Sequence, residues 1–210
     1  MGEHLVITIA RQYGSNGREI GIRVAELLGI NFYDKELITM ASQKTGISAD
    51  VINNIDEKAT NSLLYTLALS SSSHGDISAG FNMPVNDKLF VAQSEIIREL
   101  ANENDCVIIG RCGDYVLRSH KRLVSIFIYA DLETRIKRIM ERHNISYDEA
   151  KERVAKTDKR RINYYNFYTG RKWGKYDHYN LSLNSGMLGV EATAQLIANM
   201  VRSMPENDEA

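Results

Sequence analysis

Cysteine is scarce in this chain, and neither sign of charge dominates. Only two of the 210 residues are cysteines, Cys106 and Cys112, and their spacing of six matches no zinc site. We therefore expect reduced thiols, typical of a cytosolic protein, and neither a disulfide nor a metal site. The formal net charge is −1, so the chain lacks the basic field that attracts nucleic acid, and we expect no nucleic-acid partner.

Long apolar runs are also missing. No run approaches the roughly 20 residues needed to span a bilayer, and the N-terminus lacks a basic segment followed by an apolar stretch. These absences predict a soluble, cytoplasmic protein without a membrane partner. The five histidines form no i, i+4 pair and there is no G-x-S-x-G sequence, which argues against a histidine metal site and covalent hydrolase chemistry.

The apolar residues occur in short runs separated by stretches with helical spacing. With 43% hydrophobic content, 210 residues can bury one sizeable core, which favours a single domain over residues 1–210. The runs are rich in β-branched residues and predict parallel strands. They are Leu5–Ile9, Cys106–Ile109, Leu123–Tyr129 and Tyr179–Leu183, with Asn31–Tyr33 as a candidate fifth.

Five stretches between these runs have the apolar spacing of helices. They are Gly17–Leu28, Asp87–Ala101, Leu132–His143, Tyr147–Tyr165 and Gly189–Met204, with Asp131 and Ser146 placed as N-caps. The alternation of strands and helices predicts an α/β fold.

Two polar stretches interrupt the alternation. Ser70–Val85 contains a serine run and several glycines, and Lys156–His178 is dense in Lys, Arg and Tyr. Both are expected to be mobile surface insertions, the first as a disordered connection or, alternatively, as a segment that closes over substrate. The acidic tail, residues 205–210, is expected to be frayed.

Residues 6–21 have the layout of a phosphate-binding loop. An apolar run ends in a turn with Gly14 and Gly17, and the predicted helix that follows would present unpaired N–H groups to an anion. The segment departs from the usual G-x-x-x-x-G-K-[ST] pattern, because Gln12, Arg18 and Glu19 stand where the first Gly, the Lys and the hydroxyl residue would be. The alternative is an ordinary strand-to-helix turn in which the glycines serve only backbone geometry.

Polar residues follow two other predicted strands at the same topological position. Arg111 and Asp114 come just after Cys106–Ile109, at the carboxyl edge of the sheet, where ligands bind in open α/β folds. They are candidates for the site or, alternatively, an ion pair that closes a turn. Asp34 follows Asn31–Tyr33 and is either a helix N-cap or a group that orients an acceptor.

A basic tract precedes the last predicted strand. It contains Lys156, Lys159, Arg160, Arg161, Arg171, Lys172 and Lys175, interleaved with Tyr164, Tyr165, Tyr168 and Trp173. Such a run is usually a solvated face. If residues 14–19 bind a nucleotide, however, phosphoryl transfer needs positive charge on the phosphate oxygens, and the planar fork of Arg suits that task. On this interpretation residues 156–178 form a basic lid over bound phosphates.

With these segments in order, the chain resembles the cytidylate kinase-like family, relatives of the bacterial cytidylate kinases among the P-loop nucleoside monophosphate kinases. Four segments carry the resemblance, residues 9–21, 32–37, 109–112 and 179–185, and it covers nearly the whole chain. It implies a P-loop NTPase-type three-layer fold, with a five-stranded parallel sheet, helices on both faces, a helical lid and an acceptor-side helical insertion over residues 34–104. It also implies ATP as donor and a nucleoside monophosphate as acceptor.

The resemblance assigns roles to individual residues. Gly14, Ser15, Asn16, Gly17, Arg18 and Glu19 fall on the phosphate loop, Asp34 on the acceptor-side aspartate, Arg111 on the arginine that contacts the acceptor, and Asp158 and Arg161 on the Asp-x-x-Arg element of the lid. Cytidylate kinases carry Lys and Asp where this chain has Arg18 and Cys112. Arg18, or alternatively Arg11, would then replace that Lys electrostatically, and Ser15 or water would complete the shell of Mg²⁺. Further candidates are Arg160 as a lid cation, and Asp114 and Arg171 as acceptor contacts.

These observations predict an ATP- and Mg²⁺-dependent kinase acting on a small phosphorylated acceptor, most simply CMP or dCMP. The alternatives are a kinase for a different small metabolite and a nucleotide-binding regulatory module without transfer activity, as the missing Lys would suggest. The many Arg and Lys residues of the predicted lid favour an enzyme, because a sensor has little need to stabilise charge on a transferring phosphoryl group.

Overall fold

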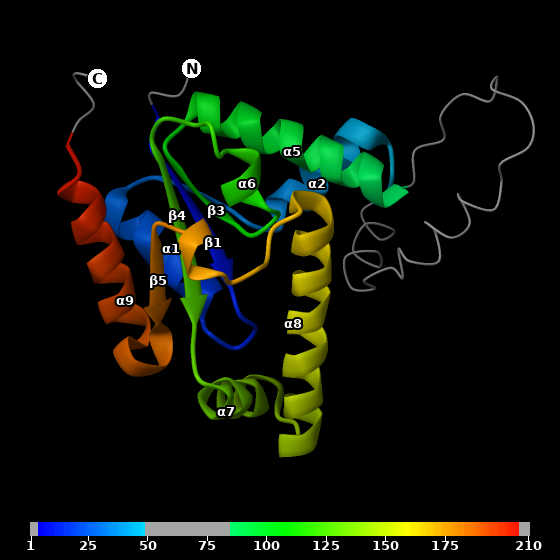
Figure 1. Cartoon of the computed structure of the whole chain (residues 1–210), viewed down its shortest axis with the longest axis vertical. Coiled ribbons are helices and arrows are strands. Elements are labelled where there is room, and N and C mark those ends of the chain that lie inside the picture. The colour runs from blue at the N-terminus through cyan, green and yellow to red at the C-terminus, as the bar shows by residue number, and fades with distance from the viewer. Residues whose placement is uncertain (1–3, 49–84, 206–210) are drawn as a thin grey trace, which may run out of the picture.

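A five-stranded parallel sheet lies at the centre of this computed structural model, which describes residues 4–48 and 85–205 (Figure 1). The strand order is β2-β3-β1-β4-β5, and each neighbouring pair is parallel. In the register of the sheet, Val6 of β1 pairs with Cys106 on one side and Leu123 on the other. The first strand of the chain is therefore the middle strand of the sheet.

Helices connect the parallel strands and cover both faces of the sheet. The strands are β1 (Val6–Arg11), β2 (Asn31–Tyr33), β3 (Cys106–Ile109), β4 (Leu123–Tyr129) and β5 (Leu181–Asn184). The helices are α1 (Gly17–Leu28), α2 (Glu36–Thr45), α5 (Val85–Glu103), α6 (Gly113–Val116), α7 (Leu132–His143), α8 (Tyr147–Thr169) and α9 (Ser185–Arg202), with a 3-10 helix at Tyr176–His178.

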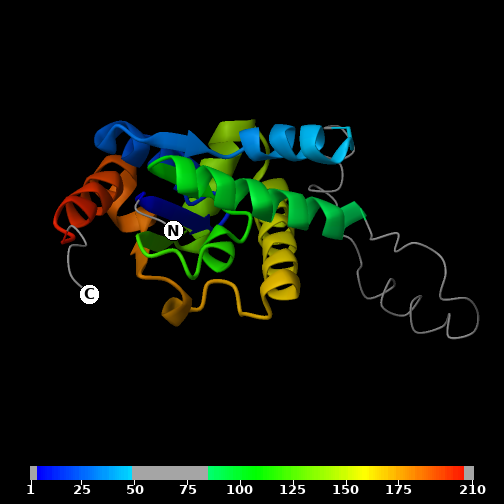
Figure 2. The ribbon, with the colours of Figure 1, turned by 90° about the horizontal axis from the view of Figure 1, so that it is seen from above.

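Two hydrophobic clusters fill the space between the sheet and its helices, because alternate residues of a strand point to opposite faces. Ile7 and Ile9 of β1 pack in one cluster with residues of α1 and α9. Val6 and Ile108 pack in the other, with residues of α2, α5 and α6. Figure 2 shows α2 and α5 running side by side over that second face. The three central strands, β1, β3 and β4, are buried over most of their length, which explains why their sequences are mainly apolar.

The predicted α/β fold with its five-stranded parallel sheet is confirmed. Each strand begins and ends within two residues of its predicted bounds. The two predicted N-caps are present: Asp131 accepts a hydrogen bond of 2.9 Å from the backbone N–H of Thr134, and Ser146 forms a capping box with Glu149. Helix α2 lies within the helical insertion that the resemblance implies over residues 34–104, whereas α6 was not expected. Helix α9 begins at Ser185 and is kinked at Gly189, where the predicted helix was to begin.

The prediction that Lys156–His178 is a surface insertion is wrong for its first part, because α8 continues through Thr169. Tyr165 and Thr169 are buried on the inner side of this helix, so this stretch belongs to a regular packed element. The predicted insertion Ser70–Val85 lies outside the described residues except for Val85, the first residue of α5. Of the predicted tail, residues 206–210 also lie outside them.

All strands end at the same edge of the sheet, and α7 lies just beyond this edge while α8 runs along the side of the molecule (Figure 1). Ile136 and Ile139 of α7 pack against Ala150 and Val154 of α8, with Tyr13 at the border of the cluster. The α7–α8 pair therefore forms a wall beside the loop that follows β1. None of the described helices is long and apolar enough to cross a membrane.

Candidate active site

The loop between β1 and α1 makes a tight turn that its own residues close. The backbone is left-handed at Gly14, with φ of 80°, and at Asn16, with φ of 58°. The backbone N–H and the hydroxyl of Ser15 both donate to the carbonyl oxygen of Gln12, at 3.3 and 2.8 Å. A Cβ at position 14 would lie 2.8 Å from the backbone oxygen of Arg135, so the loop fits against α7 only with glycine there.

The end of this loop presents a row of backbone N–H groups. Those of Asn16, Gly17, Arg18 and Glu19 have no hydrogen-bond acceptor within the described part of the chain. The Asn16 side chain does not cap the helix and instead accepts a hydrogen bond of 2.9 Å from Arg142. Aligned N–H groups at the positive end of a helix dipole bind phosphate groups. The loop therefore fits a nucleotide phosphate.

Two arginines of α7 surround the loop. Arg138 donates to the carbonyl oxygen of Gly14 at 3.4 Å and to that of Ser185 at 3.0 Å. Arg142 forms an ion pair of 2.7 Å with Glu19. Sequence reasoning missed both, although with Arg135 they recur every three to four residues on a predicted helix, the spacing of one helical face. The sequence therefore shows that the three arginines share one helical face. It does not show which part of the molecule that face contacts.

Asp34, at the end of β2, lies between two arginines. Its Oδ2 accepts a hydrogen bond of 2.7 Å from Nε of Arg18, and its Oδ1 lies 3.9 Å from Nη2 of Arg11. The alternative that Asp34 caps α2 is wrong, because the N-cap residue is Lys35 and no side chain caps that helix. Asp34 therefore connects the loop that fits a phosphate with the ends of β1 and β2.

Arg11 runs from the end of β1 across the edge of the sheet. A Cβ at Gly17 would lie 2.5 Å from Cβ of Arg11, and one at Gly110 would overlap its guanidinium. Both glycines therefore leave the space that the Arg11 side chain occupies. The turn after Gly110 is unusual, because Arg111 and Cys112 both have left-handed φ, 56° and 54°. Non-glycine residues adopt this conformation at a cost, and such strain concentrates at functional sites.

Helix α8 is joined to the loop after β1 by two side chains. Asp158 accepts a hydrogen bond of 2.8 Å from the backbone N–H of Tyr13 and pairs with Arg135 at 2.5 Å. Arg161 donates to the backbone oxygen of Arg11 at 2.7 Å, and its guanidinium lies 5.7 Å from the ring centre of Tyr13. Burial lowers the pKa of Arg161, while Asp158 opposes this shift. The predicted Asp-x-x-Arg residues thus contact the loop directly.

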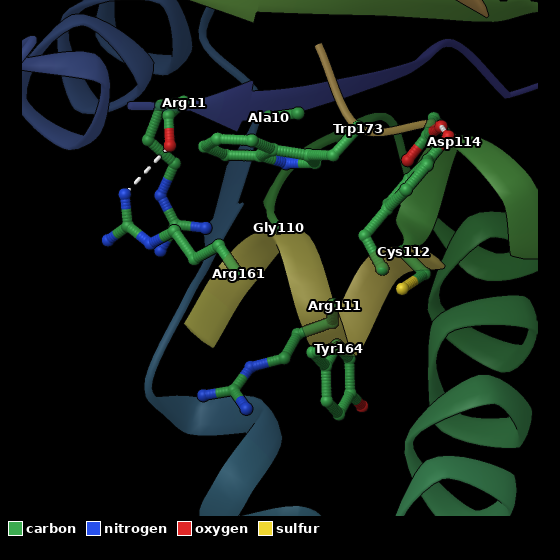
Figure 3. A pocket seen from close by; sticks show the side chains of 10 residues that line it. Ala10, Arg11, Gly110, Arg111, Cys112, Asp114, Arg161, Tyr164 and Trp173 are labelled. Carbon is green, nitrogen blue, oxygen red and sulfur yellow. Dashed lines mark hydrogen bonds between the residues drawn. The ribbon is translucent and has the colours of Figure 1, made fainter. Parts of the chain in front are cut away.

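A pocket opens at the carboxyl edge of the sheet between β1, β3 and α8 (Figure 3). Its lining residues are Ala10, Arg11, Gly110, Arg111, Cys112, Asp114, Arg161, Tyr164, Tyr165 and Trp173. In Figure 3 the three arginines lie on one side of the pocket and Asp114 on the other. The pocket therefore combines a strongly basic wall with aromatic rings and one carboxyl group.

Asp114 is buried, and its carboxyl accepts a hydrogen bond of 2.6 Å from the hydroxyl of Tyr165. Burial raises the pKa of Asp114, and the hydrogen bond from Tyr165 partly offsets this rise. Both cysteines are buried and free, and burial raises their pKa values, to about 12 for Cys106. Thiols held protonated are poor nucleophiles, so neither cysteine is suited to covalent catalysis.

The structure brings together most of the predicted site residues. Arg111, Asp114 and Arg161 line the pocket, and Asp34 and Arg18 join it through Arg11. Two predicted residues do not line the pocket: Arg160, on α8, and Arg171, whose guanidinium lies 5.3 Å from the ring centre of Tyr115 and whose charge lowers the pKa of the lining residue Asp114. Ser15 is fully buried inside the loop, and its role in holding Mg²⁺ stays a prediction.

Comparison with known proteins gives weak similarity to curated sequences. The cytidylate kinase of Saccharolobus islandicus is 21% identical over 206 residues, which are 98% of this chain and 95% of that protein. Uronate isomerase of Corynebacterium glutamicum is 26% identical over 143 residues, but the match covers only 27% of that protein and 68% of this chain.

Solved structures agree on the fold. An uncharacterised protein from Eubacterium ventriosum superposes with a TM-score of 0.70 and 27% identity, over 96% of this chain and all of that one. Shikimate kinase from Acinetobacter baumannii, solved with shikimate, gives a TM-score of 0.53 at 16% identity, over 95% of this chain and 94% of that one. The model of the cytidylate kinase-like family matches residues 6–187. This chain belongs to the cytidylate kinase-like family.

Proposed function

We propose that this protein transfers a phosphoryl group from ATP, with Mg²⁺, to a small phosphorylated acceptor, most simply CMP or dCMP. The observation that carries the proposal is that two groups of potential anion ligands lie next to each other at one edge of the sheet. The N–H groups of residues 16–19 fit a donor phosphate, and Arg11, Arg111 and Arg161 line the adjacent pocket. Asp34 connects the two groups.

On the donor side, the loop residues Gly14 to Glu19 would hold the phosphates through backbone N–H groups and the dipole of α1. Mg²⁺ is usually held by substrate phosphates, water and one or two carboxylates. Residues 4–48 and 85–205 contain no cluster of three or more His, Cys, Asp or Glu that could hold a metal by itself, which suits an ion that arrives with ATP. Ser15, Asn16 and Glu19 supply the loop's side-chain oxygens.

On the acceptor side, Arg111 and Arg161 would bind and orient the phosphate group of the acceptor, for which the guanidinium fork is suited. Phosphoryl transfer asks the protein for in-line positioning and for positive charge around the transferring group, not for a covalent intermediate. Trp173 and Tyr164 border the pocket and would exclude water from it. The buried carboxyl of Asp114 would contact a polar group on the rest of the acceptor.

A different small metabolite is the second candidate acceptor. Cys112 lines the pocket where the cytidylate kinases carry Asp, so the pocket lacks the carboxylate expected for a cytosine base at that position. A regulatory module that binds ATP without transferring phosphate is the third candidate, because the loop carries Arg18 in place of Lys.

The test measures ADP release from ATP and Mg²⁺ with CMP, dCMP, UMP, AMP and GMP as acceptors, beside equilibrium binding of ATP. We expect turnover with CMP or dCMP at about 1–100 per second. Arg111→Ala should raise the KM for the acceptor and leave ATP binding unchanged, with Arg118→Ala as a control outside the pocket. ATP binding without turnover on any of these acceptors would favour another metabolite or a regulatory module.

A further inference from the structure

We propose that Arg18, which stands where phosphate loops of this type carry lysine, is a positioning residue of the acceptor half of the site. In this role it holds Asp34, and it does not bind the donor phosphates. The inference rests on the proposed function, because it divides the residues of that site between the two substrates. From the sequence we expected Arg18 to replace the phosphate-loop lysine beside the donor phosphates. The present proposal differs from that expectation.

The direction of the Arg18 side chain is the first observation. Arg18 starts from the first turn of α1, next to the free backbone N–H groups, but its Nε lies 2.7 Å from Oδ2 of Asp34, at the end of β2. The guanidinium also lies 5.7 Å from the ring centre of Phe32, on the same strand. Both contacts draw the charge toward the edge strand of the sheet and away from the loop.

Burial is the second observation. The Asp34 side chain is 9% exposed, whereas that of Arg18 is 47% exposed. Arg11 also lies near Asp34, at 3.9 Å, a distance without a hydrogen bond. Moving Arg18 to a donor phosphate would leave a nearly buried carboxylate without its hydrogen-bonded cation, which is unfavourable. The Arg18–Asp34 pair is therefore expected to persist when nucleotide binds.

The rest of the loop provides the positive charge that a donor needs. The N–H groups of residues 16–19 and the α1 dipole point into the loop, and Arg138 and Arg142 lie against it from α7. Arg142 pairs with Glu19 at 2.7 Å, and therefore offsets the negative charge that this chain carries at the usual hydroxyl position. Arg18 and Glu19, two of the three altered loop positions, are thus each paired with a residue from a different element.

Arg18 acts through Asp34, whose carboxylate it fixes at the carboxyl end of β2. The backbone N–H of Asp34 donates to Glu36 at 3.0 Å, so the residue is held at its main chain as well as its side chain. A carboxylate fixed in this way can accept a hydrogen bond from a hydroxyl or amino group. We therefore infer that the acceptor carries such a donor group within reach of Asp34, in addition to its anionic group.

The test compares Arg18→Gln and Arg18→Lys with wild type and with Arg23→Gln. Arg23 is a matched control on the same helix, because its Nε forms an ion pair of 2.8 Å with Glu191, outside the site. Two readouts are needed: the equilibrium dissociation constant of ATP with Mg²⁺, measured by calorimetry in the absence of acceptor, and the KM of the best nucleotide acceptor. The first does not depend on turnover.

We expect Arg18→Gln to raise the KM of the acceptor about tenfold or more, the effect of losing a charged hydrogen bond, while ATP affinity changes less than about twofold. Arg18→Lys should recover part of the acceptor KM, and Arg23→Gln should match wild type in both readouts. Asp34→Asn should raise the acceptor KM as well. A variant that combines Arg18→Gln with Asp34→Asn should have an acceptor KM no higher than that of the more impaired single variant.

A tenfold loss of ATP affinity in Arg18→Gln with an unchanged acceptor KM would overturn the inference, and would mean that Arg18 binds the donor phosphates. An unchanged value of both constants would overturn it too. If wild type binds ATP but uses no acceptor, the proposed function fails, and ATP affinity alone still decides whether Arg18 serves the donor. If wild type does not bind ATP, both proposals fall together.

Discussion

Asp158 of α8 and Arg135 of α7 form an ion pair of 2.5 Å beneath the phosphate loop, and their side chains are only 13% and 9% exposed. The second carboxylate oxygen of Asp158 accepts the backbone N–H of Tyr13. A helix of the predicted lid is therefore fastened to the loop by a nearly buried charge pair. Two charged side chains of α8, Asp158 and Arg161, therefore contact the loop that follows β1.

Asp158→Ala should lower the free energy of unfolding by about 3 kcal/mol or more, because it leaves Arg135 charged and nearly buried without its partner. Asp158→Asn should cost less, since its amide oxygen can still accept the Tyr13 N–H. Urea unfolding measures both. The exposed pair between Lys175 and Asp177 provides the control, and Asp177→Ala should leave the midpoint unchanged. Equal effects of Asp158→Ala and Asp177→Ala would contradict a buried pair.

Gly14→Ala should disturb the loop by two effects at once. The alanine would have to adopt the left-handed backbone conformation of Gly14. Its Cβ would also lie 2.8 Å from the backbone oxygen of Arg135. The expected loss of stability is about 1–3 kcal/mol, with a clear loss of ATP affinity. Gly46→Ala separates the effects, because Gly46 has φ of 71° but open space around it, so only the cost of the backbone conformation, about 1 kcal/mol, is expected. Unimpaired ATP binding by Gly14→Ala would contradict the phosphate loop.

Replacements of Arg111 distinguish backbone strain from function. At φ of 56°, Arg111→Gly should be more stable than Arg111→Ala by about 1 kcal/mol, because glycine adopts this conformation without strain. Both should raise the acceptor KM alike, since both remove the guanidinium. Thermal or urea unfolding together with acceptor kinetics measures the two effects. A stable Arg111→Gly variant with an unaltered acceptor KM would mean that the strained turn does not serve acceptor binding.

The burial of Asp114 should make the free energy of unfolding depend on pH. Burial raises the pKa of Asp114 above 3.8, so the folded state holds this proton more tightly, and the stabilisation is lost as pH rises through the raised pKa. Tyr165→Phe removes the hydrogen bond that opposes the rise. It should therefore raise the pKa further and cost about 1–3 kcal/mol at neutral pH, with a smaller cost as pH falls toward 3.8.

Urea midpoints of wild type and Tyr165→Phe between about pH 4 and pH 8 measure this difference. Tyr147→Phe removes a surface hydrogen bond to Glu133 and serves as the control, with no such trend expected. A cost of Tyr165→Phe that stays constant with pH would show that Asp114 does not titrate in this range.

The sheet and the tight loop after β1 could be predicted from the sequence because both depend on local patterns. Short runs of β-branched residues, separated by stretches with the apolar spacing of helices, are typical of parallel strands. Gly14 and Gly17, between a strand and a helix, indicate the loop. The position of Arg111 at the sheet edge follows from the end of β3 alone. These predictions do not depend on knowing which elements contact each other in the folded protein.

Other parts of the site depend on contacts between distant elements. The sequence does not indicate that Arg18 turns toward Asp34, or that Arg138 and Arg142 face the loop, because both follow from how α1 and α7 pack. The helix was predicted from Tyr147 to Tyr165, and its extension to Thr169 was missed because a helix packed by few inner side chains has a weak apolar pattern. The left-handed Cys112 has no sequence signal at all.

Phosphorus NMR of wild type with ATP, Mg²⁺ and CMP or dCMP tests the central claim most directly, because it identifies where the phosphoryl group goes. We predict that ADP and the nucleoside diphosphate of the acceptor form in equal amounts, with no inorganic phosphate. Unchanged spectra in the presence of bound ATP, or release of inorganic phosphate alone, would contradict phosphoryl transfer to these acceptors.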